Sequence, residues 1–97
     1  MMVNDSHKKR DIEEVLGSKA RIKILKTLAM NNELNISLII KNTRLNHSNV
    51  LKHLQILKEL NLVQEKKFGR IRIYRYKNEN IKARSLKKFI EIWEDDF

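Results

Sequence analysis

One uninterrupted stretch, Gly17 to Tyr76, limits most strongly what this chain can fold into. Up to about Leu60 its apolar residues recur every three or four positions, and beyond that point they alternate with cations. The periodicity therefore changes from helical to extended within the stretch. Two short amphipathic helices joined by a tight polar turn, followed by a basic β-hairpin, are the order of elements that this predicts. Such an arrangement can place one helix in the major groove of DNA and a cationic ribbon on the phosphates.

The charge of the chain also favours a polyanionic partner. It has 21 Lys and Arg against 12 Asp and Glu, a net charge of +9. A basic surface alone does not distinguish DNA from RNA or acidic lipid, so the order of elements has to decide. The length of 97 residues allows one small core, and a helical surface shared with a second chain would add stability.

Several classes of site are excluded by composition. The chain has no cysteine and only two glycines, Gly17 and Gly69, so it can form neither a disulfide, a cysteine-based zinc site nor a phosphate-binding glycine loop. His7, His47 and His53 are poorly spaced for a metal, because the last two do not share a helix face. We expect no cofactor, no metal and no enzyme activity. The N-terminus lacks a signal peptide and no apolar run approaches ~18 residues, which favours a cytoplasmic, nucleoid-associated protein.

Five helices are expected from the apolar spacing and from capping residues. Gly17 is expected to end the first helix in a left-handed conformation, and Ser18 to cap the second. Asn35 and Asn46 are suited to cap the third and fourth. Met30–Glu33 is expected to be a loop. The expected helices are Arg10–Leu16, a second one ending near Asn31, Ile36–Asn42, His47–Leu60 and Asn80–Asp95.

The two strand candidates, Leu62–Lys67 and Ile71–Lys77, flank a short turn that contains Gly69. A β-hairpin is the natural interpretation. Alternation leaves open which face of the second strand is buried, since the isoleucines compete with Tyr74 and Tyr76 across the pleat.

The outward face of the fourth helix carries the side chains expected to read bases. Asn and Gln can pair bidentately with adenine, while His, Ser and Lys can reach bases or phosphates. A merely solvated helix face is the alternative. For His53, packing against the edge of the core competes with a DNA contact. The candidate base-reading residues are His47, Ser48, Asn49, Lys52 and Gln55.

The hairpin is rich in cations, with Glu65 as its one acid between Gln64 and Lys77. Lys67, Arg70 and Arg72 are the main candidates for phosphate contacts. A guard against strand-to-strand aggregation is the alternative, and both roles can hold together. Arg21 and Arg44 are secondary phosphate candidates, for which ordinary solvated surface charge is an equal alternative.

The last helix has an apolar stripe richer than an end helix needs for its own packing. Packing back on the core is one interpretation, and a subunit interface is the one we favour. A two-fold dimer would place two fourth helices about one DNA turn apart and require a palindromic site. The expected interface residues are Ile12, Val15, Leu16, Leu86, Phe89, Ile90 and Trp93.

Three segments resemble winged-helix regulators of the ArsR-like group, of the kind common in archaea. They are GSKARIKILKTLA, NISLIIKNTRLNHSNVLKHLQILKELNLV and FGRIRIYRY, which together span most of the chain. The resemblance implies a homodimeric repressor that pairs through its terminal helices. It supports Ser48, Asn49 and Lys52 as DNA-reading positions, and Gly69 and Arg70 as the wing tip.

The chain departs from that group at several positions. Arg44 stands in the turn where the group usually has glycine, and Leu38 stands where a polar residue is usual. The cysteines and histidines of the metal-sensing members are missing, so metal sensing does not carry over, and no other effector site is visible.

The expected fold class is α+β, mostly α. We expect a loose segment over residues 1–9, a winged helix-turn-helix domain over 10–78 and a dimerisation helix over 79–97. The expected function is that of a sequence-specific regulator, a repressor, that binds double-stranded DNA as a homodimer. Two alternatives stay open, an architectural protein that coats DNA with little sequence preference and a winged helix that binds other proteins.

Overall fold

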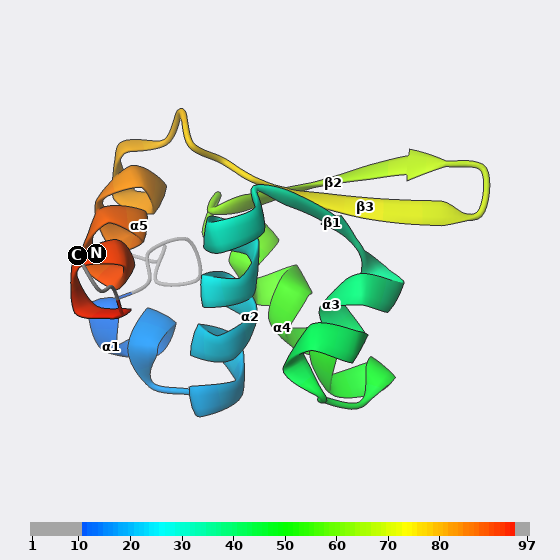
Figure 1. The fold of residues 1–97 in the computed structure, drawn as a ribbon, viewed down its shortest axis with the longest axis horizontal. Helices are drawn as coiled ribbons and strands as arrows, with labels where there is room; N and C mark the ends of the chain where they lie inside the picture. The colour runs from blue at the N-terminus through cyan, green and yellow to red at the C-terminus, as the bar shows by residue number, and fades with distance from the viewer. Residues whose placement is uncertain (1–10, 95–97) are drawn as a thin grey trace, which may run out of the picture.

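The computed structural model describes residues 11–94, in which the chain forms five helices and a three-stranded sheet (Figure 1). The expected loose segment and Phe97 lie outside the described residues. The α+β, mostly helical fold class with a two-stranded wing and a C-terminal helix is confirmed. The elements are α1 Ile12–Leu16, α2 Lys19–Asn31, β1 Glu33–Asn35, α3 Ile36–Thr43, α4 His47–Glu59, β2 Val63–Phe68, β3 Ile71–Tyr76 and α5 Ile81–Glu94.

The three predicted N-caps are confirmed. In each case a side-chain oxygen accepts a hydrogen bond from a backbone N–H of the first turn, which would otherwise lack a partner. The bonds run from Arg21 N to Ser18 Oγ (3.1 Å), from Leu38 N to Asn35 Oδ1 (2.9 Å) and from Asn49 N to Asn46 Oδ1 (2.8 Å).

The predicted left-handed cap at Gly17 is wrong. This residue has φ −80° and ψ 0°, which is a right-handed conformation. Glycine is required there for space, because a Cβ at this position would clash with the carbonyl oxygen of Glu13. The residue therefore lets the chain pass close to the end of α1 on its way into α2.

The predicted loop at Met30–Glu33 is mostly wrong, because Met30 and Asn31 are the last residues of α2 and Glu33 begins a third strand, which leaves only Asn32 outside both elements. β1 pairs antiparallel with β3, and the sheet has the order β1-β3-β2. The pairing begins beside Asn32, whose carbonyl oxygen accepts a hydrogen bond from Tyr76 N at 2.8 Å. Without β1, the backbone groups of β3 on the side away from β2 would lack partners. The three residues of β1 pair with Ile73, Tyr74 and Arg75. This pairing ties the base of the hairpin to the start of α3.

The tyrosines of β3 face the core, which settles the register that the sequence left open. Tyr74 and Tyr76 are buried, while Ile71 is exposed on the opposite face. A buried tyrosine needs a partner for its hydroxyl, and both have one. Tyr76 Oη donates to the carbonyl oxygen of Ala83 at 2.5 Å, and Tyr74 Oη donates to Glu65 Oε2 at 3.0 Å. Burial raises the pKa of Tyr76 to about 12, so its hydroxyl keeps its proton.

The core lies between the helices and the base of the sheet. α5 adds only Ala83 and Ile90 to it. Figure 1 shows β2 and β3 extending away from the helices as a ribbon, with α1 and α5 at the opposite end of the molecule. Among residues 11–94, no helix is long and apolar enough to cross a membrane. The other buried apolar side chains are Val15, Ile24, Leu25, Leu28, Ala29, Ile39, Val50, Leu54, Leu57, Leu62, Val63, Tyr74 and Tyr76.

Candidate nucleic-acid interface

The turn between α3 and α4 fixes how the fourth helix is presented. Arg44 has φ 61°, and its N–H donates to the Ile40 carbonyl oxygen at 2.8 Å. This left-handed conformation is one that glycine adopts without strain, so arginine occupies it at a cost in stability. The Arg44 side chain is exposed, and Leu45 packs inward behind it. The turn thus closes tightly in front of α4 and leaves a cation at its outer edge.

All five candidate base-reading side chains are exposed on α4, while Val50, Leu54 and Leu57 of the same helix are buried. Two of the five are held within the chain. Ser48 Oγ donates to Asn46 Oδ1 at 3.1 Å, and Gln55 Nε2 donates to Glu59 Oε2 at 3.3 Å. Both partners are on α4 or its cap, so these bonds do not draw the side chains into the core. The polar face of α4 is exposed to solvent from His47 to Gln55.

His53 faces inward and is not part of this polar face. It is buried, and its Nδ1 accepts a hydrogen bond from Arg21 Nε at 3.3 Å. Burial first, and then the positive charges of Arg21 and Lys52, lower the pKa of His53 below its ordinary value of 6.5. The packing interpretation of this residue is the one that the structure supports.

Arg21 is unsuited to the phosphate contact expected for it. Its exposure is 8%, and its guanidinium is used inside the fold. Besides the bond to His53, Nη1 donates to the carbonyl oxygen of Glu14. Arg21 therefore joins α1, α2 and α4. Helical spacing alone could not separate this position from the surface cations around it.

We define the wing as β2, β3 and the turn between them. Its tip, at that turn, carries unpaired cations. Lys67 and Arg70 are exposed, and neither forms an ion pair with any residue between 11 and 94. Gly69 has φ 62°, a left-handed conformation that explains the glycine in this two-residue turn. The tip thus offers two positive charges to a polyanion.

Arg72 differs from these two cations, because the acid of the hairpin holds it. Glu65 accepts from Lys58 Nζ at 2.7 Å through Oε1, and from Arg72 Nε at 2.9 Å through Oε2, which also accepts from Tyr74. The Glu65 side chain is only 10% exposed. The hydrogen bond from Lys58 first, and those from Arg72 and Tyr74 after it, lower the pKa of Glu65 to about 2 against the opposing effect of burial.

Sequence reasoning named Glu65 but missed what it does. The signal was present, since strand alternation places Glu65 on the same face as Val63, which is a buried position. A single acid on the inward face of a cationic ribbon needs cationic partners. The identity of the helix partner, Lys58, depends on the docking of α4 and could not be read from the pattern.

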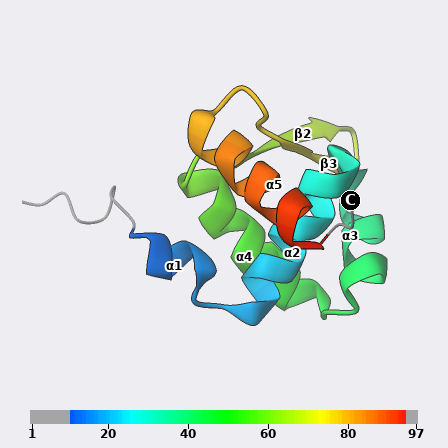
Figure 2. The same cartoon turned by 60° about the vertical axis from the view of Figure 1, so that its left-hand side comes forward.

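The residues predicted for subunit contact fall into two groups. Val15 and Ile90 are buried in the core, and Leu86 is half-buried against it. Phe89 and Trp93 are 55% and 76% exposed, and their rings stack with centroids 6.0 Å apart. In Figure 2 α5 runs across the front of the molecule, and no other described element covers it. We call the exposed apolar residues here the terminal patch: Ile12, Leu16, Phe89, Ile92 and Trp93.

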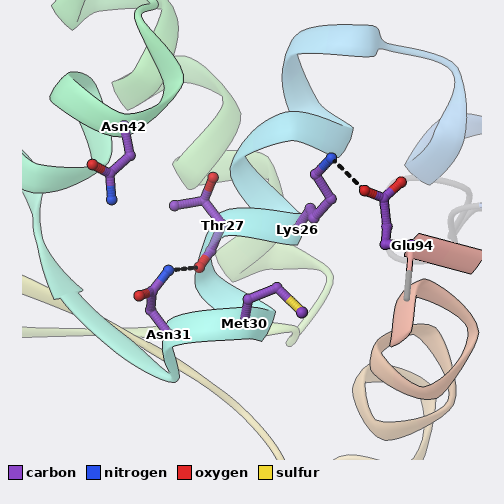
Figure 3. Close-up of a pocket in the computed structure, with 6 residues that line it drawn as sticks. All are labelled: Lys26, Thr27, Met30, Asn31, Asn42 and Glu94. Carbon is purple, nitrogen blue, oxygen red and sulfur yellow. Dashed lines mark hydrogen bonds and ion pairs between the residues drawn. The ribbon is translucent and has the colours of Figure 1, made fainter. Parts of the chain in front are cut away.

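A shallow hollow of about 270 Å³ lies between α2, Asn42 of α3 and the end of α5 (Figure 3). Four of its lining residues already interact in pairs. Lys26 Nζ and Glu94 Oε1 are 3.2 Å apart, and Asn31 Nδ2 donates to the Thr27 carbonyl oxygen at 2.7 Å. The Lys26–Glu94 pair ties the last turn of α5 to α2. Among residues 11–94, no three His, Cys, Asp or Glu side chains are grouped to hold a metal ion.

A known family model matches about half of the chain. Residues 18–65 match the model described as "Bacterial regulatory protein, arsR family". The matched segment begins at the cap of α2 and ends in β2, so it contains α2, α3 and the whole of α4. None of the curated protein sequences matches the chain.

Solved structures share the fold over most of the chain. Reduced HlyU from Vibrio cholerae has a TM-score of 0.75 at 19% identity, covering 88% of this chain and 86% of that one. The transcriptional repressor BigR from Xylella fastidiosa has 0.72 at 17% identity, with coverages of 87% and 83%. AF1382 from Archaeoglobus fulgidus has 0.66 at 24% identity, with coverages of 89% and 100%. At these identities the likeness establishes the fold alone.

Proposed function

Since residues 18–65 form a domain of the arsR family of bacterial regulatory proteins, we propose that this chain regulates transcription by binding a specific double-stranded DNA site as a homodimer, and that it acts as a repressor. The fold is that of DNA-binding transcriptional regulators. Sequence specificity, the sign of regulation and the dimer go beyond the family assignment and are argued below.

The observation that carries sequence specificity is the exposed polar face of α4. Its first turn presents His47, Ser48 and Asn49 to solvent, and Lys52 and Gln55 follow one and two turns later. Short polar groups at the start of such a helix reach base edges in the major groove, and a lysine further along reaches a phosphate or a guanine. A protein that only coated DNA would need lysines or arginines here, and this turn has an imidazole, a hydroxyl and an amide instead.

The wing supplies the electrostatic part of the interface. Lys67 and Arg70 at its tip are the proposed phosphate contacts, with Arg44 at the turn before α4 as a further one. Arg72 would have to leave Glu65 to take part. Contacts of this kind position the protein on the duplex without reading its sequence.

The terminal patch supports the homodimer. It leaves three large apolar side chains of α5, Phe89, Ile92 and Trp93, open to solvent, and such residues are enriched at the centre of protein interfaces. A two-fold axis through this patch pairs identical surfaces and places two copies of α4 on successive turns of DNA. Repression is the step that rests most on likeness, in particular on BigR, which is described as a repressor.

The first experiment compares binding to the DNA upstream of the protein's own gene with binding to random duplex of equal length, across a salt series. Preference for the upstream DNA by at least ~10³, with protection of a palindrome, is the expected result. Equal affinity with a steep salt dependence would instead identify a coating protein. Absence of binding at low salt would favour the protein-interaction alternative.

Two substitutions separate base reading from phosphate contact. Asn49→Ala is expected to cost about 1–3 kcal/mol of binding free energy on the preferred sequence and almost nothing on random duplex. Lys67→Ala is expected to weaken binding to every sequence alike. Equal losses on both DNAs for Asn49→Ala would contradict its base-reading role.

A further inference from the structure

The carboxylate of Glu65 joins α4, the helix with the candidate base-reading residues, to the wing. Glu65 lies on the core-facing side of β2, and its two oxygens have different partners. Oε1 pairs with Lys58 in the last turn of α4, while Oε2 accepts from Arg72 and Tyr74 of β3. One side chain thus contacts the helix that carries the base-reading face and both strands of the ribbon.

The hydrogen bonds of Glu65 are short and largely buried, so they can hold its three partner side chains in place. Its side chain is 10% exposed, and all three bonds are 3.0 Å or shorter. Bonds from charged donors to a carboxylate are stronger than bonds between neutral groups, and a largely buried charge that loses one partner is penalised. Of the three bonds, the one from Lys58 links the wing to α4, so a rotation of the wing relative to α4 would act on this bond.

The same carboxylate also withholds charge from DNA. Arg72 is 37% exposed, so it is near the surface, but its Nε points to Glu65. Lys58 is 32% exposed and is held in the same way. One cation of α4 and one of β3 are therefore paired with an acid within the fold, whereas Lys67 and Arg70 at the tip form no ion pair with any residue between 11 and 94.

From this arrangement we propose that Glu65 is a specificity-determining residue, which positions the wing against the reading helix and keeps Arg72 and Lys58 from binding phosphates indiscriminately. The proposal rests on the proposed function, since it concerns how DNA sequences are discriminated. Glu65 itself touches no DNA in this account and acts through its three partners.

The test is to replace Glu65 by glutamine and to measure two affinities across a salt series. The probes are a duplex selected in vitro from a random library with the wild-type protein, and unselected random duplex of equal length. E65Q is expected to bind random duplex several-fold more tightly, with a salt slope steeper by up to about 0.9 for each phosphate gained. The ratio of the two affinities is expected to fall at least about tenfold, as for the loss of one base contact.

Glu79 provides a matched control. It pairs with Arg75 at 2.8 Å, so E79Q removes the same charge and an arginine's ion pair, while Arg75 keeps its bonds to Gln64 and the link to α4 stays intact. E79Q is expected to keep the wild-type affinity ratio. An equal fall in the ratio for E79Q would reduce the effect to net charge and overturn the proposal.

A second variant keeps the proposal testable if E65Q does not fold. Lys58→Met removes only the bond between α4 and Glu65, at a partly exposed position, and leaves Arg72 paired with Glu65. It is expected to lower the affinity ratio without tightening the binding of random duplex. A ratio within about threefold of wild type for a folded E65Q, or for K58M, overturns the positioning role while the proposed function stands. If the wild-type protein itself fails to discriminate, the proposed function falls, and the role of Glu65 with it.

Discussion

Helices α4 and α5 are nearly equal in length and both are amphipathic, yet they are buried to very different extents. The inward stripe of α4, from Val50 to Leu57, is covered within the chain, and its outer face is polar. α5 buries Ala83 and Ile90 and leaves Phe89 and Trp93 open. An apolar stripe therefore indicates that a helix will be covered but not by what. In α4 the chain itself covers the stripe, and in α5 it covers only part of it; the proposed dimer would cover the rest.

The largest expected difference between the two helices is in how a substitution changes the free energy of unfolding. Leu57→Ala removes a fully buried side chain and is expected to lower the free energy of unfolding by about 2–5 kcal/mol. Phe89→Ala, at an exposed position, is expected to change it by no more than about 0.5 kcal/mol in dilute protein. Denaturant titrations at low protein concentration measure both. Similar losses for the two variants would mean that α5 belongs to the folding core as fully as α4.

Substitutions in α5 are expected to affect self-association more than folding. Trp93→Ala is expected to weaken the proposed dimer by about 2 kcal/mol or more, roughly thirtyfold in its dissociation constant, because large aromatic side chains dominate interface energies. Sedimentation equilibrium measures this directly. Leu38→Ala serves as the control, since Leu38 is an exposed apolar residue of α3 away from the terminal patch. A wild-type protein that stays monomeric at high concentration would contradict the dimer.

The buried polar residue of α4 gives a third, smaller effect. His53→Leu leaves Arg21 Nε without its acceptor and is expected to cost about 1–3 kcal/mol. It is also expected to reduce the acid sensitivity of the fold. The pKa of His53 is lowered in the folded state, so the unfolded chain takes up the proton first. The stabilisation is complete above about pH 6.5 and is lost as the pH falls toward the lowered folded-state pKa.

Unfolding curves at pH 7 and at pH 5 check this prediction for wild type and for His53→Leu. Gln55→Leu, an exposed substitution in the same helix, should retain the full difference between the two pH values. If His53→Leu shows the same acid loss as wild type, another group is responsible.

The smallest effect concerns the turn in front of α4. Arg44→Gly places glycine at the left-handed position and is expected to stabilise the fold by up to about 1 kcal/mol, since the strain at φ 61° is removed. The same variant removes a proposed phosphate contact, so DNA affinity should fall as thermal stability rises. Thermal unfolding together with a binding titration shows whether the two properties move in opposite directions.

Local signals predicted a large part of this fold. The caps at Ser18, Asn35 and Asn46 and the turn at Gly69 depend on neighbours only a few residues away, and those predictions are confirmed. One local prediction failed, the left-handed cap at Gly17, because the nearby Glu13 carbonyl oxygen and not a positive φ requires glycine there. The buried face of β3, which stayed open, depends on distant partners. The inward face of β3 was decided by hydroxyl partners on Glu65 and Ala83, which no alternation pattern shows.

The candidate site divides in the same way. The exposure of the α4 reading face follows from helical period, and the five residues chosen for it are all exposed. Their DNA contacts remain predictions. Charge alone could not rank the cations: Arg21 is bound inside the fold, Arg72 is held by an acid, and Arg70 is unpaired among residues 11–94.

The short strand β1 has a consequence for the order in which parts of the chain fold during synthesis. It pairs Glu33 with Arg75, two residues separated by more than the whole helix-turn-helix. The helices and the hairpin can form from near neighbours, but this pairing closes a long loop and is expected to come late. On the ribosome α4 would emerge and coil before β3 has emerged to meet β1. We therefore expect the nascent chain to hold a formed α4 without an oriented wing until β3 has emerged and paired with β1.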